Sequence, residues 1–118
     1  MNGPGAQLPV HNLAGQARCL TVVVAAFNEA EALPLLHPRI QAALATVPEV
    51  QGRVLYVDDG SSDATWAVLQ ALAADDGRVG LLRLSRNFGK EVALTAGLDQ
   101  VTEGAAVILD ADGQDPPE

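Results

Sequence analysis

The sequence predicts an α/β fold, a Rossmann-like parallel sheet with helices on both of its faces. Three observations lead to it. Four short apolar runs are nearly free of charge, helical patterns separate them, and acidic segments follow three of the runs directly. Repeated strand–helix–strand order requires crossover connections, and strands this apolar are the kind that is buried on both faces. We therefore expect a nucleotide-binding type of architecture.

Each element can be assigned from the spacing of apolar residues. The predicted strands are residues 20–26, 53–57, 79–84 and 105–109. A first helix follows the apolar spacing of residues 36–47, although Pro38 should bend it or delay its start. A second helix follows Asp63, a suitable N-cap residue. A third begins after the Gly89-Lys90 turn and should end at Gly104.

Size and charge limit the classes of function. The chain has 118 residues, 48% of them hydrophobic, which is enough for one small core and less than most complete α/β enzymes contain. Residues 1–18 show no sustained period and are predicted to be a flexible leader, which leaves residues 19–118 for the fold. A net charge of −8 with only seven Lys and Arg argues against a nucleic-acid partner.

The sequence contains no candidate for a membrane span. No run approaches the roughly 18 to 20 apolar residues that a membrane helix needs. The N-terminal residues also lack the charged and apolar regions of a signal peptide. We therefore expect a cytoplasmic protein without a membrane span in this chain.

Carboxylates follow three of the predicted strands: Glu29 after the first, Asp58 and Asp59 after the second, and Asp110 and Asp112 after the fourth. The carboxyl ends of parallel strands meet at one edge of a sheet, so these groups would repel one another unless a cation shared the site. Mg²⁺ or Mn²⁺ is typically held by one or two carboxylates plus substrate phosphates. Asp110 and Asp112 are therefore the candidate metal ligands, although acidic residues also serve as ordinary turn and capping residues.

Other polar residues suggest how a nucleotide would be held. Asp59, more than Asp58, is expected to accept hydrogen bonds from a base or a ribose. Lys90 and Arg86 flank a turn that opens a helix, which suits the diphosphate of a nucleotide sugar, although both could simply be solvated. His37 lies between turn-forming segments without partners at metal-ligand spacing, and we expect it to be inert.

Four segments in this order resemble the family-two glycosyltransferases of the GT-A fold, in particular the branch of dolichyl-phosphate mannose synthases and bactoprenol glucosyltransferases. The segments are VAAFNE at 24–29, VDDGSSD at 57–63, SRNFGKE at 85–91 and DADGQDPPE at 110–118. The likeness spans about residues 20–118. It implies the nucleotide-sugar-binding half of a GT-A domain, truncated before an acceptor-binding half.

The resemblance also assigns residues to roles. By it, Ala25, Phe27, Glu29, Val57 and Asp59 would line the nucleoside pocket, while Asp110, Ala111, Asp112 and Gln114 would meet the ribose, the diphosphate and the metal. Lys90 joins the nucleotide-sugar-binding set. Asp110 and Asp112 would be the catalytic and metal-binding residues, with Asp112 the stronger candidate.

The activity that the resemblance implies is transfer of a sugar from a UDP- or GDP-sugar to an acceptor such as a polyprenyl phosphate. Transfer would proceed with inversion, depend on Mg²⁺ or Mn²⁺, and serve envelope glycan synthesis at the cytoplasmic face of the membrane. The chain alone could be inactive, so a non-catalytic nucleotide-binding module is the alternative.

A second alternative is a magnesium-binding phospho-acceptor signalling domain. Such a domain would need its acidic pair after the first strand and a single Asp after the third, where this chain has Ser85-Arg86-Asn87. An exposed last strand, residues 105–109, would make the chain only marginally soluble. Assembly into a homo-oligomer stays open.

Overall fold

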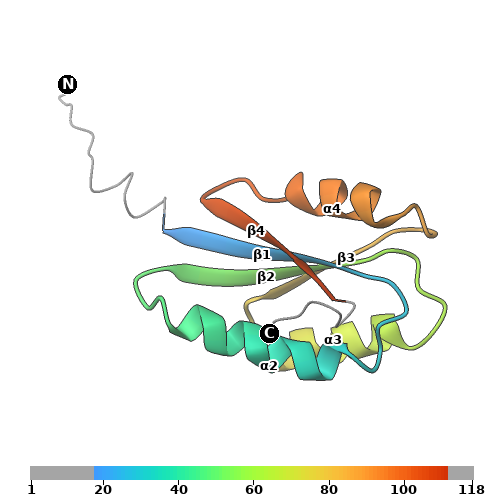
Figure 1. The fold of residues 1–118 in the computed structure, drawn as a ribbon, viewed down its shortest axis with the longest axis horizontal. Coiled ribbons are helices and arrows are strands. Elements are labelled where there is room, and N and C mark those ends of the chain that lie inside the picture. Colours follow the sequence, from blue (N-terminus) through green and yellow to red (C-terminus); the bar gives the residue numbers. More distant parts are fainter. Residues whose placement is uncertain (1–17, 112–118) are drawn as a thin grey trace.

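The computed structural model describes residues 18–111 as one parallel sheet between two helical layers (Figure 1). The elements are β1 Cys19–Ala26, α2 Leu33–Ala45, β2 Gln51–Asp58, α3 Thr65–Asp75, β3 Val79–Arg83, α4 Lys90–Leu98 and β4 Ala105–Asp110. The strand order is β3-β2-β1-β4, with every pair parallel. Helices α2 and α3 cover one face and α4 covers the other, which confirms the predicted α/β class.

The chain changes direction across the sheet at β1. It runs from β1 through β2 to β3 on one side, and then returns to place β4 on the other side of β1. In open parallel sheets the ligand crevice lies at the carboxyl ends of the strands, at such a reversal of strand order. The topology therefore points to the ends of β1 and β4.

Alternate residues of the strands pack into two separate hydrophobic cores, one on each face of the sheet. Val22, Val24 and Tyr56 point to the α2–α3 side, while Val23 and Val57 point to the α4 side. This alternation is the two-residue period of a strand that is buried on both faces, and it explains why the central strands have no polar side. Rigid packing on both faces fixes the positions at which β1 and β2 end.

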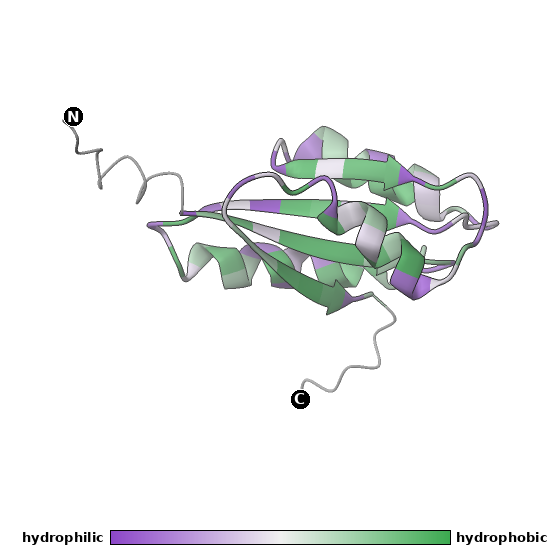
Figure 2. Cartoon of the chain, turned by 90° about the horizontal axis from the view of Figure 1, so that it is seen from above, coloured by the Kyte–Doolittle hydropathy of each residue, from purple (hydrophilic) through white to green (hydrophobic). Residues whose placement is uncertain are grey.

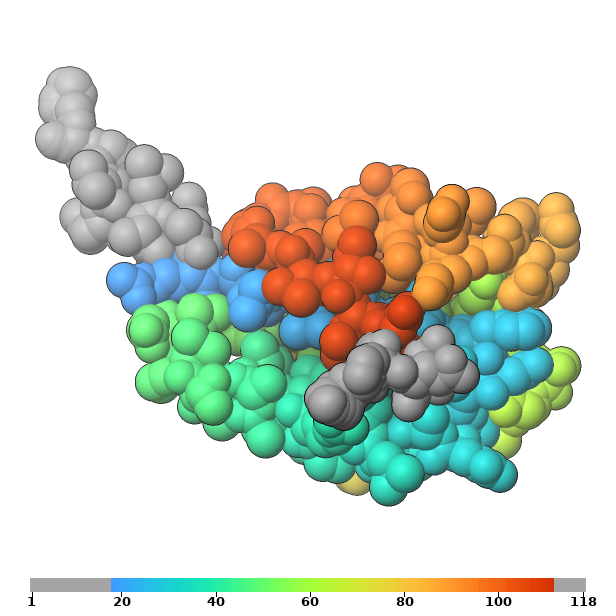
Figure 3. Space-filling view, viewed as in Figure 1, coloured from blue at the N-terminus to red at the C-terminus, as the bar shows by residue number. Residues whose placement is uncertain are grey.

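Strand β4 is the exception, because it forms an edge of the sheet and its first four residues are exposed, while Leu109 is partly buried. Val107 and Ile108 are 46% and 48% exposed, and neighbouring residues on a strand point to opposite faces. Figure 2 shows this strand, which leads to the C-terminus, coloured hydrophobic at the margin of the sheet. Figure 3 shows its orange-red atoms at the surface. The predicted exposure of the last strand is confirmed.

Two helix boundaries differ from the expectation. Pro38 neither delays nor ends α2, which begins at Leu33 and continues through it. The residue costs one hydrogen bond near the first turn, and burial of Ile40 and Leu44 against the sheet outweighs that loss. Gly104 does not close the third helix: α4 ends at Leu98, and Gly104 forms the turn before β4.

Asp63, the expected N-cap of the second helix, lies one residue before the observed N-cap. The N-cap of α3 is Ala64, which makes no side-chain cap. Asp63 Oδ1 nevertheless accepts a hydrogen bond from the backbone N–H of Thr65 at 2.9 Å, and the Thr65 hydroxyl donates to it as well. The hydroxyl bond holds the pKa of Asp63 below its usual value. Asp63 thus satisfies a helix-start donor from outside the helix.

His37 was expected to lie between turn-forming segments, and this placement is wrong. It lies inside α2 with 3% of its surface exposed. Its Nδ1 is 2.7 Å from the Tyr56 hydroxyl and its Nε2 is 3.0 Å from Asp76 Oδ2. The three residues connect α2, β2 and the segment after α3, so the role of His37 is structural. The sequence could not show this because both partners are distant in the chain.

The ends of the chain lie largely outside the described residues. Of the predicted leader, 1–18, only Arg18 is described, and its carbonyl accepts a hydrogen bond from the Gln51 N–H at 2.6 Å. Within residues 18–111, none of the helices is both long and apolar enough to cross a membrane.

Candidate functional site

Strand register brings the ends of the four strands to one edge. Ala26 pairs with Asp58, Ala25 with Asp110, and Asp58 with Arg83. A cavity of about 230 Å³ lies at this edge. It is lined by Ala25, Ala26, Phe27, Glu29, Asp59, Asn87, Gly89, Lys90, Asp110 and Ala111. The cavity is smaller than the roughly 300 Å³ at which ligand pockets begin, so it could enclose only part of a nucleotide sugar.

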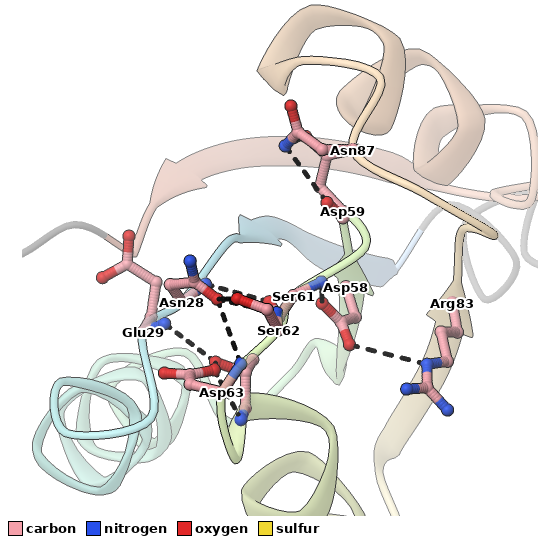
Figure 4. A network of polar contacts seen from close by, with 10 residues as sticks. Asn28, Glu29, Asp58, Asp59, Ser61, Ser62, Asp63, Arg83 and Asn87 are labelled. Carbon is pink, nitrogen blue, oxygen red and sulfur yellow. Dashed lines mark hydrogen bonds and ion pairs between the residues drawn. The ribbon is translucent and has the colours of Figure 1, made fainter.

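Asp59 organises the segment that leads into α4 (Figure 4). Its Oδ1 accepts from the Phe88 N–H at 2.8 Å, and its Oδ2 accepts from the Gly89 N–H at 3.1 Å and from Asn87 Nδ2 at 3.0 Å. Only 2% of Asp59 is exposed. A carboxylate offers about four acceptor positions, so these bonds leave room for about one further donor. Asp59 therefore shapes the cavity wall and retains capacity for a ligand N–H.

Gly60 allows the segment after β2 to approach the segment after β3. Its φ is +70°, and a Cβ at this position would lie 2.2 Å from the backbone carbon of Arg86. No side chain fits at that distance, so the contact between the two loops depends on glycine. The Asp-Gly pair thus does more than form an ordinary turn, because it keeps Asp59 within reach of residues 87–89.

Helix α4 is also held close to the sheet by a glycine. A Cβ on Gly97 would lie 2.7 Å from Val23 Cγ1 and 2.9 Å from Val57 Cγ2. The absence of a side chain lets the helix lie close over β1 and β2. This packing fixes the height of the helix N-terminus, and with it Lys90, relative to the strand ends.

Lys90 and Asp110 form an ion pair across the cavity. The Lys90 ammonium is 3.0 Å from Asp110 Oδ1 and 3.1 Å from Oδ2, and the side chains are 55% and 32% exposed. The helix that carries Lys90 thereby places a cation beside the carboxylate at the end of β4. An exposed pair of this kind contributes little stability, so its geometry matters more for what the site can bind.

Asp58 has a different role from its neighbour. It is fully buried and its Oδ1 accepts from the Ser61 N–H at 3.0 Å, while its Oδ2 has no hydrogen-bond partner among the described residues. The nearest cation is Arg83, whose Nε lies 3.9 Å from Oδ2 (Figure 4) and whose guanidinium covers the Trp66 ring. Asp58 does not line the cavity. It supports the turn that follows β2.

The structure brings most of the expected site residues together. Seven of them line the cavity: Ala25, Phe27, Glu29, Asp59, Lys90, Asp110 and Ala111. Val57 does not line it, because its side chain points into the core beneath α4 and is fully buried. Asp112 and Gln114 lie outside the described residues.

The sequence analysis did not assign Ala26, Asn87 and Gly89, which also line the cavity. Asn87 and Gly89 belong to the same segment as Lys90, and that segment lies at the end of β3. The position of this segment after a strand was the signal that could have identified them.

Metal ligands are only partly described. Within residues 18–111 no group of three or more His, Cys, Asp or Glu side chains could hold an ion. Asp110 offers one partly exposed carboxylate at the cavity, shared with Lys90. One or two carboxylates plus substrate phosphates are enough for Mg²⁺ or Mn²⁺. The donor set therefore fits an ion whose remaining ligands would come from a bound diphosphate.

A larger hollow of about 640 Å³ lies elsewhere, at the amino ends of the strands, lined by residues such as Gln51, Arg78 and Glu103. Its size alone would favour it as a ligand site. Parallel sheets bind ligands at the carboxyl ends, where loop residues gather, and the acidic segments of this chain lie there. We therefore place the candidate site in the smaller cavity.

Curated proteins similar to this chain are glycosyltransferases. The chain is 43% identical over 100 residues to a bactoprenol glucosyl transferase of Shigella phage SfX, covering 84% of this chain and 32% of that protein. It is 39% identical over 100 residues to an undecaprenyl-phosphate 4-deoxy-4-formamido-L-arabinose transferase of Yersinia pestis, covering 84% and 30%. The chain thus spans about a third of the length of the relatives that it matches.

Solved structures show the same fold. Mannosyltransferase PcManGT from Pyrobaculum calidifontis, in complex with GDP-Man and Mn²⁺, matches with a TM-score of 0.57 and 27% identity, over 79% of this chain and 27% of that one. S. aureus TarS matches with a TM-score of 0.60 and 21% identity, over 79% and 27%. These neighbours confirm the GT-A type of α/β fold, and the match covers 27% of the length of each of them.

The family comparison covers nearly all of the described fold. The family described as glycosyl transferase family 2 matches residues 21–118. That range contains β2, β3, β4, all but the first two residues of β1, and every residue that lines the cavity. It favours a glycosyltransferase over a phospho-acceptor domain. The chain belongs to glycosyl transferase family 2.

Proposed function

We propose that this chain is the donor-binding part of a metal-dependent glycosyltransferase that uses a nucleoside-diphosphate sugar. The observation that carries the proposal is the meeting of Asp59, Lys90 and Asp110 around one cavity at the reversal of strand order. These residues supply an acceptor for a base or ribose, a cation for a phosphate, and a carboxylate for a metal. The proposal assigns residues 19–118 to the nucleotide-sugar-binding domain.

Each residue has a proposed task. The Phe27 ring, 41% exposed at the cavity, would lie against the base. Asp59 would use its remaining acceptor position for a base N–H or a ribose hydroxyl. Lys90 would contact the diphosphate, which requires that it share or leave Asp110. Ala25, Glu29 and Ala111 would complete the wall.

A divalent ion, Mg²⁺ or Mn²⁺, would be held by Asp110 together with Asp112, and Gln114 would lie near the diphosphate. When bound, the ion stabilises the charge of the departing nucleoside diphosphate. The similarity to the Mn²⁺-bound mannosyltransferase structure supports a divalent metal. Val57 would act from the core, by supporting the cavity wall beneath α4.

The proposed acceptor is a polyprenyl phosphate. Relatives named as bactoprenol and undecaprenyl-phosphate transferases support this substrate class. An acceptor phosphate is already an anionic nucleophile, so direct attack on the sugar carbon would invert its configuration without a strong base on the protein. The acceptor would be bound by parts of the protein beyond this chain, at the cytoplasmic face of the membrane.

Calorimetric titration of the full chain with UDP and GDP, with and without Mn²⁺, tests the proposal. We expect binding of one nucleotide that requires Mn²⁺ and is lost in Asp112→Ala. Asp75→Ala, which removes the same charge from the exposed end of α3, should bind as the unaltered chain does. Binding without metal dependence would favour a non-catalytic nucleotide-binding module, and no binding under any condition would contradict the proposed site.

A further inference from the structure

Asn28 stands between two cavity residues without lining the cavity itself. Its neighbours Phe27 and Glu29 line it. Asn28 is exposed and adopts a φ of +54°, and it is the only residue other than glycine with a positive φ within residues 18–111. The left-handed region is unfavourable for most side chains and is tolerated best by Asn and Asp, so this position suits asparagine. The contacts of Asn28 show what holds it.

The Asn28 side chain caps the loop that follows β2. Its Oδ1 lies 2.9 Å from the Ser62 backbone nitrogen and 3.3 Å from that of Asp63, and both N–H groups donate to it. The Ser62 hydroxyl is a third donor at 3.4 Å. In return, the Asn28 N–H donates to Ser61 Oγ at 2.9 Å. Figure 4 shows these contacts joining the two loops.

The residues after Asn28 continue the connection. The Glu29 N–H donates to Thr65 Oγ1 at 2.8 Å, and the Ala30 N–H lies 3.4 Å from Asp63 Oδ2. Every one of these bonds joins the β1–α2 segment, through a side chain, to the β2–α3 segment or to Thr65, the first residue of α3. These contacts restrain the backbone at Asn28 and Glu29, and with it the segment that carries Phe27 and Glu29 at the cavity.

We infer that Asn28 is a positioning residue of the donor site. Its hydrogen bonds connect the β1–α2 loop to the β2–α3 loop and thereby hold Phe27 and Glu29 in the cavity wall. The inference rests on the proposed nucleotide-binding function. Asparagine meets both requirements, since it tolerates a positive φ and supplies an acceptor for two backbone N–H groups. Glycine meets the first only, aspartate meets both, and alanine meets neither.

These differences define the experiment. In the full chain, Asn28→Gly and Asn28→Asp are compared by titration with UDP and GDP in the presence of Mn²⁺, and by hydrogen exchange of the Ser62 and Asp63 amides. Asn28→Gly should weaken nucleotide binding by about tenfold, the loss of roughly two ordinary hydrogen bonds, and speed exchange at both amides. Asn28→Asp should bind within about twofold of the unaltered chain and keep both amides protected.

A control separates positioning from loss of stability. Thr46→Val removes the hydroxyl bond to the Ala43 carbonyl at the far end of α2, so it should lower the melting temperature without changing nucleotide affinity. Equal affinity of Asn28→Gly and the unaltered chain would overturn the positioning role. Unchanged exchange at Ser62 and Asp63 would show that Asn28 does not connect the two loops. If the unaltered chain binds neither nucleotide, the proposed function fails, and the amide exchange still decides whether Asn28 connects the two loops.

Discussion

The ammonium group of Lys90 lies 3.0 and 3.1 Å from the two carboxylate oxygens of Asp110. The cation at the start of α4 is therefore paired with the carboxylate that is proposed to bind the metal. The Lys90 side chain is 55% exposed, so it can leave this partner at little cost, and another anion would favour that change. A bound diphosphate would supply one, because it can pair with Lys90 while Asp110 turns to the ion. The geometry thus couples metal binding to nucleotide binding.

Replacing Lys90 should weaken that coupling. Lys90→Gln leaves Asp110 without its cation, so we expect Mn²⁺ alone to bind several-fold more tightly. Added nucleotide should then raise the affinity for Mn²⁺ by less than it does in the unaltered chain. Calorimetry with Mn²⁺, with and without UDP or GDP, measures both quantities. Arg39→Gln removes the same charge from the exposed surface of α2 and serves as the control. Equal Mn²⁺ affinity in both variants would contradict the coupling.

The neighbouring residues Asp58 and Asp59 should respond differently to the same substitution. Asp59→Asn puts an amide where Oδ2 accepts from the Gly89 N–H, and leaving a buried donor unpaired costs about 1–3 kcal/mol. Asp58→Asn keeps an oxygen for the Ser61 N–H and removes a buried charge. The other oxygen of Asp58 has no hydrogen-bond partner within residues 18–111, and its cation, Arg83, is half-exposed and 3.9 Å away. The cost of Asp58→Asn should be below about 1 kcal/mol. Urea unfolding of both variants measures the difference, and an equal loss would show that Asp58 is bonded as fully as Asp59.

Acid stability should depend on Asp76. The backbone N–H of Arg78 leads the hydrogen bonds that hold the pKa of Asp76 below its usual value, with Gln41 and His37 adding to it. A lowered pKa contributes stability that is complete above the unfolded value of about 4 and is lost as the pH falls below it. Asp76→Asn should therefore flatten the dependence of the unfolding free energy on pH below about 4. An unchanged acid slope would contradict this role.

The exposed edge strand should cause self-association. Val107 and Ile108 present apolar surface on both faces of β4, and unpaired edges of this kind recruit other strands. Ile108→Lys should raise the concentration at which the chain stays monodisperse, as measured by light scattering. Leu35→Lys, on α2, adds the same charge at an isolated residue that is 74% exposed, and should change little. A concentrated chain that is monodisperse and melts cooperatively would contradict the expectation.

The sequence was sufficient for the class of fold and for most of the cavity. Nearly charge-free runs alternating with helical spacing predicted the four strands, and residues after them, such as Phe27, Asp59 and Lys90, do meet at one edge. The reason is general: in a parallel sheet, position after a strand already determines position in space.

What the sequence could not show depends on partners that are distant in the chain. The burial of His37 requires Tyr56 and Asp76, and the path of α2 through Pro38 depends on packing against the sheet. The position of Val57 in the core, away from the cavity, follows from the direction of one side chain. Spacing along the chain carries no information about these contacts.

The most direct test of the donor site is to titrate the chain with UDP and GDP in the presence of Mn²⁺ and to follow its backbone amides by NMR. The account predicts that saturable shifts centre on residues 25–29, 59, 87–90 and 110–111, at the carboxyl ends of the strands. Shifts centred instead on the larger hollow at the opposite edge, around Gln51, Arg78 and Glu103, or no saturable shifts at all, would contradict it.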